Sequence, residues 1–256
     1  MVAIAGLDVT PLALEEQRGF LPDLSAVSTE AARKARAMVL NYPNNPTAAV
    51  ASEVFLREAV DFCIDNDILL IHDFPYVDMV YGGYEAPSIL ALPGGLEIGV
   101  ELFSCSKSFH MGGFRVGWVI GNADAVAALV RVKGAVDFNQ YLGIQRAAVA
   151  ALTQPREHLR RDAAVYESGR DTLVTHLNRV GWEAPLPQAS MYVWTRLPKG
   201  LEDSFAFTVA LARETGVCLA PGRGFGVRGE GYVRFALVRE SEVLARAVER
   251  IWALLG

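Results

Sequence analysis

One lysine and one arginine lie in a stretch of the chain that is otherwise small, hydroxylic or apolar. In this stretch, residues 102–120, Lys107 follows Ser104 and Ser106, and Arg115 comes eight residues after the lysine. Low-dielectric surroundings disfavour the ammonium form of a lysine, and a neutral lysine amine can attack a carbonyl group to form a Schiff base. Serine hydroxyls and an arginine guanidinium can donate hydrogen bonds to a phosphate. The stretch therefore predicts a site for an aldehyde cofactor that carries a phosphate; the alternative is a turn with a solvated lysine.

Other candidate groups also follow predicted strands. Asn45 comes after the strand predicted at residues 37–41, and Asp73 and Tyr76 come after the one predicted at 68–72. In an open α/β sheet, ligands bind beyond the carboxyl ends of the strands. We therefore expect these three side chains to converge with the lysine at one edge of a sheet.

The elements that must position these groups alternate between strands and helices. This alternation predicts an α/β fold with a largely parallel sheet covered on both faces. The predicted strands lie at residues 2–7, 37–41, 68–72, 98–103 and 115–120, with helices at 24–36 and 54–66.

Beyond residue 121 the pattern becomes mostly helical and then mixed, which predicts a second, smaller α+β domain from about residue 155. The helices are predicted at 123–134, 141–152, 155–179, 201–215 and 240–255, and the strands at 189–196, 217–220 and 232–238.

The composition argues against several classes of partner. A net charge of −5 without a basic cluster gives no reason to expect nucleic acid, and no apolar run is long enough to span a bilayer. Three widely spaced cysteines favour reduced thiols in the cytoplasm, and the four histidines lack metal-ligand spacing, so we expect no metal site.

Four strings in the sequence form a recognisable set: YPNNPT at residues 42–47, DFPY at 73–76, SCSK at 104–107 with Arg115, and VRF at 233–235. They resemble those of the class I/II aminotransferases, which are pyridoxal 5′-phosphate (PLP) enzymes of fold type I. Their order and spacing agree with the family across nearly the whole chain. The stretch around the lysine and the string MYVWTRLP look most like the subgroup of LL-diaminopimelate and alanine aminotransferases.

The resemblance implies that PLP is the cofactor and that Lys107 is the catalytic residue, which forms the Schiff base and moves a proton. Asp73 would pair with the pyridinium nitrogen, and Tyr76 and Asn45 would hydrogen-bond the phenolic oxygen of the ring. The structural alternatives are a strand-end cap, a packed aromatic and a turn residue, respectively. The Asn45-Pro46 bond is a candidate cis peptide, as in the family.

The resemblance also assigns the two anionic groups of the reaction. Ser104 and Arg115 would bind the PLP phosphate, with Ser106 as a weaker candidate. Arg234 lies inside an apolar predicted strand, where a charge is costly unless it is paired. The resemblance makes it the group that binds the substrate α-carboxylate; the alternative is a structural ion pair.

Three features near these groups receive no role in the reaction. Residues 224–229 match G-x-G-x-x-G, but they precede a predicted strand instead of opening a helix, so a dinucleotide site is not predicted. Cys105 lacks a histidine partner and is interpreted as a small filler, and His110 as a loop residue.

The sequence departs from the family pattern at its start. The N-terminal arm and the first part of the family's large domain have no counterpart, and Ala48 stands where relatives usually have glycine. We expect residues 1–154 to be the C-terminal portion of the PLP-binding large domain and residues 155–256 to be the small α+β domain. An exposed sheet edge and an incomplete phosphate site should follow.

Two classes of function are compatible with these residues. The first is an aminotransferase that acts on an L-amino acid and a 2-oxo acid, homodimeric as the family implies, with activity impaired by the truncation. The second is a non-catalytic fragment that needs a missing half or a partner subunit. A PLP-dependent lyase of the same fold is a further alternative, and the sequence does not identify the amino donor.

Overall fold

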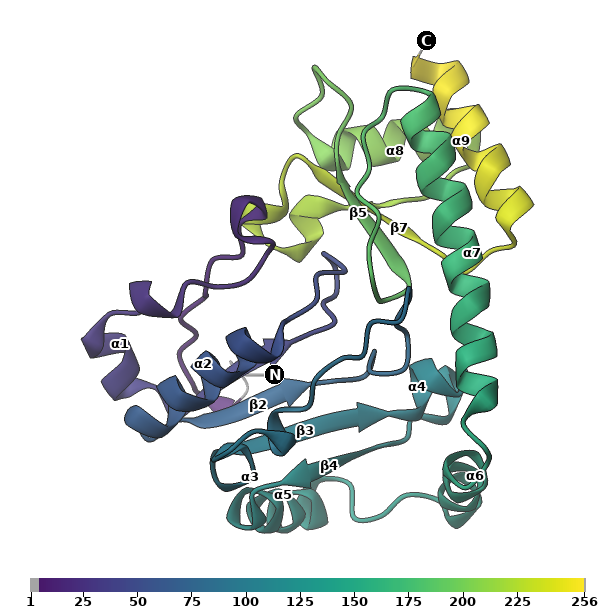
Figure 1. Ribbon diagram of the computed structural model, residues 1–256. Helices are drawn as coiled ribbons and strands as arrows, with labels where there is room; N and C mark the ends of the chain where they lie inside the picture. Colours follow the sequence, from purple (N-terminus) through teal and green to yellow (C-terminus); the bar gives the residue numbers. More distant parts are fainter. Residues whose placement is uncertain (1–4, 256) are drawn as a thin grey trace.

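The computed structural model describes residues 5–255 and contains two sheets with helices around them (Figure 1). The first sheet has the strand order β1-β2-β3-β4, and the second has the order β5-β7-β6. The long helix α7 runs alongside both sheets (Figure 1). The predicted α/β architecture, with a second and smaller sheet, is confirmed.

The strands of the first sheet come from short apolar runs. β1, β2 and β3 are parallel, whereas β4 runs antiparallel to β3. The carboxyl ends of the three parallel strands therefore meet at one edge. The strands are β1 (Ala37–Asn41), β2 (Leu69–Asp73), β3 (Gly99–Ser104) and β4 (Gly117–Gly121).

Helix α2 (Glu53–Asp65) covers one face of this sheet, as its apolar spacing predicts. The Ser52 hydroxyl oxygen accepts a hydrogen bond from the Phe55 amide at 3.2 Å, which caps the first turn. Phe55, Leu56 and Val60 pack with the buried side chains of β1 and β2 in one apolar cluster. Short helices complete this part of the chain: η2 (Glu16–Arg18), η3 (Leu24–Ala26), α1 (Thr29–Lys34), η4 (Ile89–Ala91), α3 (Gly95–Ile98), α4 (Cys105–Ser108) and η5 (Gly112–Phe114).

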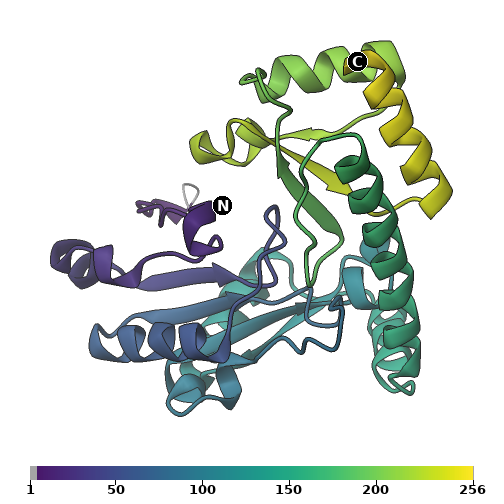
Figure 2. The ribbon, with the colours of Figure 1, turned by 45° about the horizontal axis from the view of Figure 1, so that its top comes forward.

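The second sheet is packed against three helices, which surround it in Figure 2. Leu173, Leu211 and Ile251, one from each helix, join the buried strand residues Val193 and Val233 in a single apolar cluster. The elements are α7 (Glu157–Arg179), β5 (Tyr192–Arg196), α8 (Ser204–Thr215), β6 (Ala220–Pro221), η6 (Gly222–Phe225), η7 (Val227–Gly229), β7 (Tyr232–Ala236) and α9 (Ser241–Leu255).

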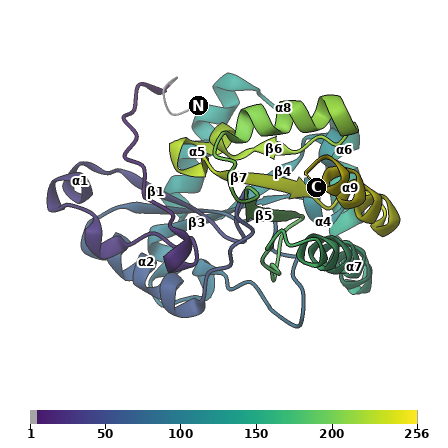
Figure 3. The ribbon, with the colours of Figure 1, turned by 90° about the horizontal axis from the view of Figure 1, so that it is seen from above.

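Parts of the first sheet and two helices leave apolar surface uncovered. Within residues 5–255, β1 and β4 each pair with a single neighbouring strand, and Val39 of β1 is 61% exposed. Every residue of α5 (Ala123–Val136) is at least partly exposed, and Ala148 is the buried residue of α6 (Leu142–Leu152). The expectation of a sheet covered on both faces is therefore wrong for β1, and the expected exposed edge is present. Figure 3 shows α1 and α2 on the opposite side of the molecule from α7 and α9.

The structure differs from several predicted elements, and two of the differences have local causes. The predicted helix 24–36 is interrupted because Ser28 caps a new helix, α1. The predicted strand 115–120 begins at residue 117 because Arg115 adopts a left-handed backbone, with φ 53°. The predicted strand 217–220 is reduced to β6, which pairs two residues with β7. Of the predicted strand 2–7, residues 2–4 lie outside the described residues, and residues 5–7 are not extended strand.

Among the helices of residues 5–255, none combines the length and apolarity needed to cross a membrane.

Candidate active site

The carboxyl edge of the first sheet brings together side chains that are distant in sequence. β1 and β2 are in register so that Asn41 lies opposite Asp73, and the Asn41 Nδ2 donates a hydrogen bond to the Asp73 carbonyl at 2.7 Å. The Oδ1 of Asn41 accepts a bond from the Asn45 amide at 2.9 Å. Arg234 of β7 reaches across from the second sheet, and its Nη1 donates to the Asn45 Oδ1 at 2.6 Å.

Lys107 lies in the short helix α4, directly after β3. The Ser104 hydroxyl oxygen caps this helix by accepting a hydrogen bond from the Ser106 amide at 3.1 Å. The lysine is half-buried, and its Nζ lies 5.6 Å from the centroid of the Tyr76 ring. The end of β3 and the cap of α4 therefore place the amine beside the loop that follows β2.

Tyr76 is buried between the two sheets. Its hydroxyl lies 3.3 Å from the hydroxyl of Tyr192, the first residue of β5. Burial raises the pKa of Tyr76 above its ordinary value, and the hydrogen bond with Tyr192 acts in the same direction. Tyr76 therefore stays a neutral phenol at physiological pH, able to donate one hydrogen bond.

Asp73 ends β2 as a half-buried carboxylate. Burial raises its pKa, and the neighbouring His72 acts in the opposite direction. Within residues 5–255 its carboxylate forms no ion pair with a lysine or arginine. A cationic group that entered the site beside Asp73 would therefore find a carboxylate ready to pair with it.

Arg234 is a half-buried cation held by aromatic rings. Its Cζ lies 4.1 Å from the ring centroid of Tyr192 and 4.7 Å from that of Phe225. Its Nε is buried without a hydrogen-bond partner among the described residues. The structural ion pair that the sequence left open as an alternative has no carboxylate partner in residues 5–255, so this guanidinium has unused donors for an anion.

The side chains of two predicted phosphate-binding residues, Ser104 and Arg115, are bonded to other parts of the chain. The Ser104 oxygen is engaged in the helix cap, and Ser106 supplies the amide to it. Arg115 is exposed, and its Nη1 donates to the Gly112 carbonyl at 3.0 Å. No hydrogen bond within residues 5–255 joins the Arg115 side chain to Ser104, Ser106 or Lys107.

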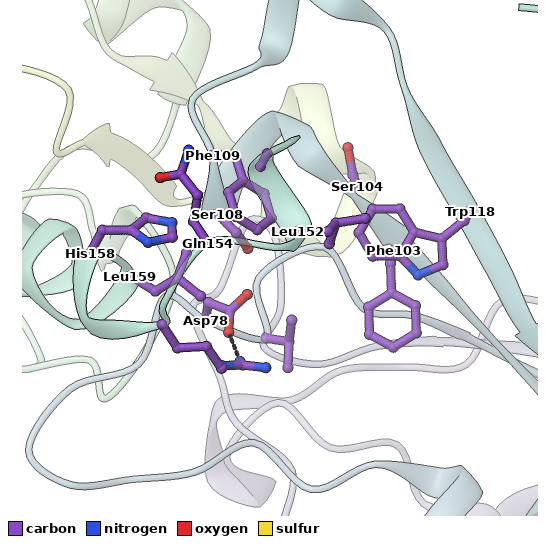
Figure 4. Close-up of a pocket in the computed structure, with 13 residues that line it drawn as sticks. Asp78, Phe103, Ser104, Ser108, Phe109, Trp118, Leu152, Gln154, His158 and Leu159 are labelled. Carbon is purple, nitrogen blue, oxygen red and sulfur yellow. Dashed lines mark hydrogen bonds and ion pairs between the residues drawn. The ribbon is translucent and has the colours of Figure 1, made fainter. Parts of the chain in front are cut away.

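A cavity of about 190 Å³ lies beside α4, on a side that does not include the lysine (Figure 4). The stacked rings of Phe103 and Trp118 form part of its wall, and Ser104 lies at its edge. At the other end, the Asp78 carboxylate accepts a hydrogen bond from Arg156 at 2.5 Å. Of the predicted site residues, Ser104 alone lines this cavity, so the cavity does not mark the convergence of the others.

Three residues of the site were not predicted from the sequence: Asn41, Tyr192 and Phe225. Asn41 is a polar residue at the end of a strand, and the same signal identifies Asp73. Phe225 belongs to the G-x-G-x-x-G string, whose last glycine serves loop packing: a Cβ on Gly229 would lie 2.2 Å from the Gly222 carbonyl oxygen. The interpretation of this string as a loop before β7 is confirmed.

Two other residues near the lysine have structural partners. Burial raises the pKa of the Cys105 thiol, which is the opposite of what a nucleophile needs. The Nε2 of His110 lies 3.3 Å from the carboxylate of Asp162 in α7, and its ring stacks on Tyr166. Within residues 5–255, no three His, Cys, Asp or Glu side chains are grouped as metal ligands would be. The Asn45-Pro46 peptide is cis, as is Tyr42-Pro43.

Comparison with known proteins assigns the chain to a family. Residues 1–251 match the family model described as Aminotransferase class I and II. The chain belongs to this family. Class I and II aminotransferases are PLP-dependent, so the comparison supports PLP as the cofactor.

Relatives and solved structures of the class I and II aminotransferases agree with this assignment. The chain is 42% identical to the LL-diaminopimelate aminotransferase of Moorella thermoacetica over 99% of its own length, and it spans 65% of that relative. It superimposes on a probable N-succinyldiaminopimelate aminotransferase from Thermus thermophilus with a TM-score of 0.92 and 46% identity, covering 98% of this chain and 67% of that one. An aspartate aminotransferase from Thermotoga maritima gives a TM-score of 0.91 at 27% identity, covering 99% and 65%.

The residues at the sheet edge fit the ring end of PLP. An unpaired carboxylate suits a protonated ring nitrogen, a buried phenol suits an oxygen acceptor, and a half-buried amine suits an aldehyde. The orphaned Nε of Arg234 adds a donor for a carboxylate. The fit is poorer at the phosphate end, because the guanidinium of Arg115 is solvent-exposed and bonded to a backbone carbonyl.

The substitution Asp73→Asn is expected to stabilise the PLP-free chain at neutral pH. Because burial raises the pKa of the Asp73 carboxyl, the folded chain holds this proton more tightly than the unfolded chain. The contribution of the carboxyl to stability is therefore greatest below its ordinary pKa and is lost as pH rises through the raised value. An amide does not ionise, so the variant should become more stable than wild type as the pH rises from the ordinary pKa of the carboxyl to the raised one. This difference in stability should persist at higher pH.

Urea unfolding at acid and neutral pH measures this difference, with Asp65→Asn as a control for an exposed carboxylate on α2. The control should match wild type at both pH values. A wild-type chain more stable than Asp73→Asn at neutral pH would contradict the expectation.

Proposed function

We propose that the protein is a PLP-dependent aminotransferase that moves an amino group between an L-amino acid and a 2-oxo acid. The observation that carries this proposal is the convergence of Lys107, Asp73, Tyr76 and Arg234 at one sheet edge. Each of these groups has unused bonding capacity, and the combination of an amine, a carboxylate, a phenol and a guanidinium matches the needs of this reaction.

When bound, PLP supplies an aldehyde that condenses with amines and a ring that withdraws electrons from the attached carbon. Lys107 would provide the amine and would also be the group that moves a proton. Asp73 holds the ring nitrogen in its protonated form. Tyr76 and Asn45 donate hydrogen bonds to the phenolic oxygen; the Asn45 Oδ1 already accepts from Arg234, so its Nδ2 is left to donate.

Anionic groups are bound at the two ends of the site. Arg234 binds the substrate α-carboxylate, using donors that the chain leaves unpaired. Ser104, Ser106 and Arg115 bind the phosphate, which requires the Arg115 side chain to exchange its bond to Gly112 for the phosphate. The low number of preorganised phosphate donors favours weak PLP binding.

The domain division also remains a proposal: residues 1–154 belong to the PLP-binding domain and residues 155–256 form the small domain. The N-terminal segment contacts the small domain, since Glu16 pairs with Arg196 at 2.7 Å.

We place the protein in the cytoplasm, where the three free thiols would stay reduced. Homodimerisation would cover apolar side chains of the α5–α6 region such as Phe138 (83% exposed) and Tyr141 (76% exposed), and light scattering tests it.

The names of the relatives narrow the set of substrates worth testing. Two of the relatives, which are 42% and 41% identical to this chain, are named LL-diaminopimelate aminotransferases. LL-diaminopimelate, alanine and glutamate are therefore the amino donors to test first, with 2-oxoglutarate as the acceptor.

The substitution Lys107→Ala is expected to abolish covalent capture of PLP. Purified wild-type chain is incubated with PLP and reduced with borohydride, and the modified peptide is located by mass spectrometry. Wild type should carry the label on residue 107, and the variant should carry none there. Transamination should fall by at least the roughly 10²- to 10⁴-fold that a positioned proton-transfer group contributes.

Lys199→Ala, which removes an exposed lysine from a loop, is the matched control and should behave as wild type. Labelled wild type that converts 2-oxoglutarate into glutamate would support the aminotransferase; elimination products instead would identify a lyase. Wild type without label would refute the proposal for this chain and favour the second class, a non-catalytic fragment. The exposed apolar surface of α5 is the observation that favours that class.

A further inference from the structure

A tyrosine of the second sheet connects the lysine end of the candidate active site to its arginine end. Tyr192 is buried, and its hydroxyl lies 3.3 Å from that of Tyr76, with the ring centroids 6.0 Å apart. The face of the same ring carries the guanidinium of Arg234, whose Cζ lies 4.1 Å from the ring centroid. One side chain therefore contacts two residues to which the proposed function gives separate tasks.

The packing around Tyr192 holds it on two sides. It pairs with Ala236 across β5 and β7, so Arg234 is its diagonal neighbour on the same face of the sheet. Tyr76 and Met79 pack against it in a small buried cluster. A side chain restrained by both a strand ladder and a buried cluster can fix the positions of the groups it touches.

We propose that Tyr192 is a positioning residue: its hydroxyl orients the Tyr76 phenol, and its ring holds the Arg234 guanidinium toward the substrate carboxylate. This inference rests on the proposed function. A phenol has one proton, so a Tyr76 that donates to a cofactor oxygen must accept its second hydrogen bond from another donor. The Tyr192 hydroxyl is within reach for that bond. The ring contributes a cation–π contact to Arg234, whose Nε has no hydrogen-bond partner among the described residues.

Charged and titratable groups from five elements or adjoining loops surround Tyr76. Burial raises the pKa of Tyr76, and Tyr192 and Asp73 act in the same direction, whereas Arg234 lowers it. The hydrogen bond with Tyr192 raises this pKa when Tyr76 is its donor. When Tyr76 donates to a cofactor oxygen instead, Tyr192 becomes the donor, and a single-atom substitution removes that bond. The surrounding groups are Asp73, Lys107, Tyr166, Tyr192 and Arg234.

Two substitutions separate the hydroxyl of Tyr192 from its ring. Tyr192→Phe keeps the ring and should move the pH midpoint of the visible absorbance of the PLP-loaded chain upward by about 0.5–1 pH unit, because Tyr76 loses its orienting bond. Its dissociation constant for 2-oxoglutarate should stay within about twofold of wild type. Tyr192→Leu removes the ring and should weaken 2-oxoglutarate binding about 2- to 30-fold, the range of a cation–π contact.

Tyr84→Phe is the matched control, because its hydroxyl donates to the Ala51 carbonyl away from the site. It should leave both readouts unchanged. A Tyr192→Phe midpoint equal to wild type, or a Tyr192→Leu chain that binds 2-oxoglutarate as tightly as wild type, would overturn the inference. The 2-oxoglutarate measurement, followed by tryptophan fluorescence, is also made on the PLP-free chain. A failure of wild type to load PLP therefore refutes the proposed function and still leaves the role of the ring tested.

Discussion

Replacing Arg234 by glutamine is expected to lower kcat/KM for any amino donor by about 30- to 4,000-fold. A buried, hydrogen-bonded charge pair with a substrate carboxylate typically contributes about 2–5 kcal/mol, and each 1.36 kcal/mol corresponds to a factor of ten. In this chain the Nε of Arg234 is buried without a partner, and its Nη1 bonds a neutral amide, Asn45. No carboxylate in residues 5–255 competes for the guanidinium, so the loss should fall on the substrate.

The loss should appear mainly in KM. A carboxylate bound equally in the ground state and the transition state contributes uniform binding, which raises KM when it is removed and leaves kcat nearly unchanged. Arg234→Lys should recover part of the loss, since it restores the charge without the fork geometry. Calorimetric titration with 2-oxoglutarate provides the same comparison without turnover.

Arg239→Gln serves as the control, because Arg239 is an exposed arginine just beyond β7. It should change KM by less than about twofold, as surface substitutions do. An Arg234→Gln chain that binds 2-oxoglutarate within about threefold of wild type would contradict the assignment of Arg234 to the carboxylate.

Replacing Glu101 by leucine is expected to lower the free energy of unfolding by about 3–5 kcal/mol. Glu101 is 1% exposed, and its carboxylate accepts from the Ile89 amide at 2.8 Å and the Ser88 hydroxyl at 2.9 Å. Its Oε1 also lies 3.1 Å from the Nδ1 of the fully buried His72. The Nε2 of His72 lies 2.9 Å from the Tyr42 carbonyl oxygen, so each ring nitrogen has a hydrogen-bond partner.

The leucine would leave the Ile89 amide, the Ser88 hydroxyl and the His72 Nδ1 without this partner in the interior. Adding His72→Leu to Glu101→Leu removes the buried imidazole that has lost its partner, so the double variant should be more stable than Glu101→Leu alone. Glu58→Leu, at an exposed position of α2, is the control and should lie within about 0.5 kcal/mol of wild type. Urea denaturation measures all three; a Glu101→Leu chain within about 1 kcal/mol of wild type would disprove the expectation.

This buried pair also concerns the site. His72 precedes Asp73 in β2, and its bond to the Tyr42 carbonyl ties the strand to the loop that carries Asn45. Loss of the pair should therefore weaken PLP binding as well as stability. In the sequence, His72 and Glu101 are isolated polar residues in apolar strands. The register of β2 with β3 sets them opposite each other, which explains how two polar side chains can be buried there.

The sequence by itself determined the elements of the fold and the chemical types at the sheet edge. The strands β1 to β3 and the helices α2, α7 and α9 follow from local apolar spacing, which is a property of adjacent residues. The chemistry of Asn45, Asp73 and Lys107 was also readable, because each comes shortly after a strand and parallel strands end at one edge.

Only the tertiary structure decided which distant groups meet and which do not. The contacts Asn45–Arg234 and Tyr76–Tyr192 join residues that are 189 and 116 positions apart. No local pattern contains them, since they depend on how the second sheet packs over the first.

The tertiary structure also decided where the Arg115 side chain lies and how much of α5 is exposed. Arg115 takes a left-handed backbone and bonds to Gly112, and α5 stays partly exposed along its whole length, although their sequences resemble those of the family. Side-chain placement and burial are set by the neighbours a segment finds in space. A sequence pattern specifies the type of a residue, and the fold determines which residues it contacts.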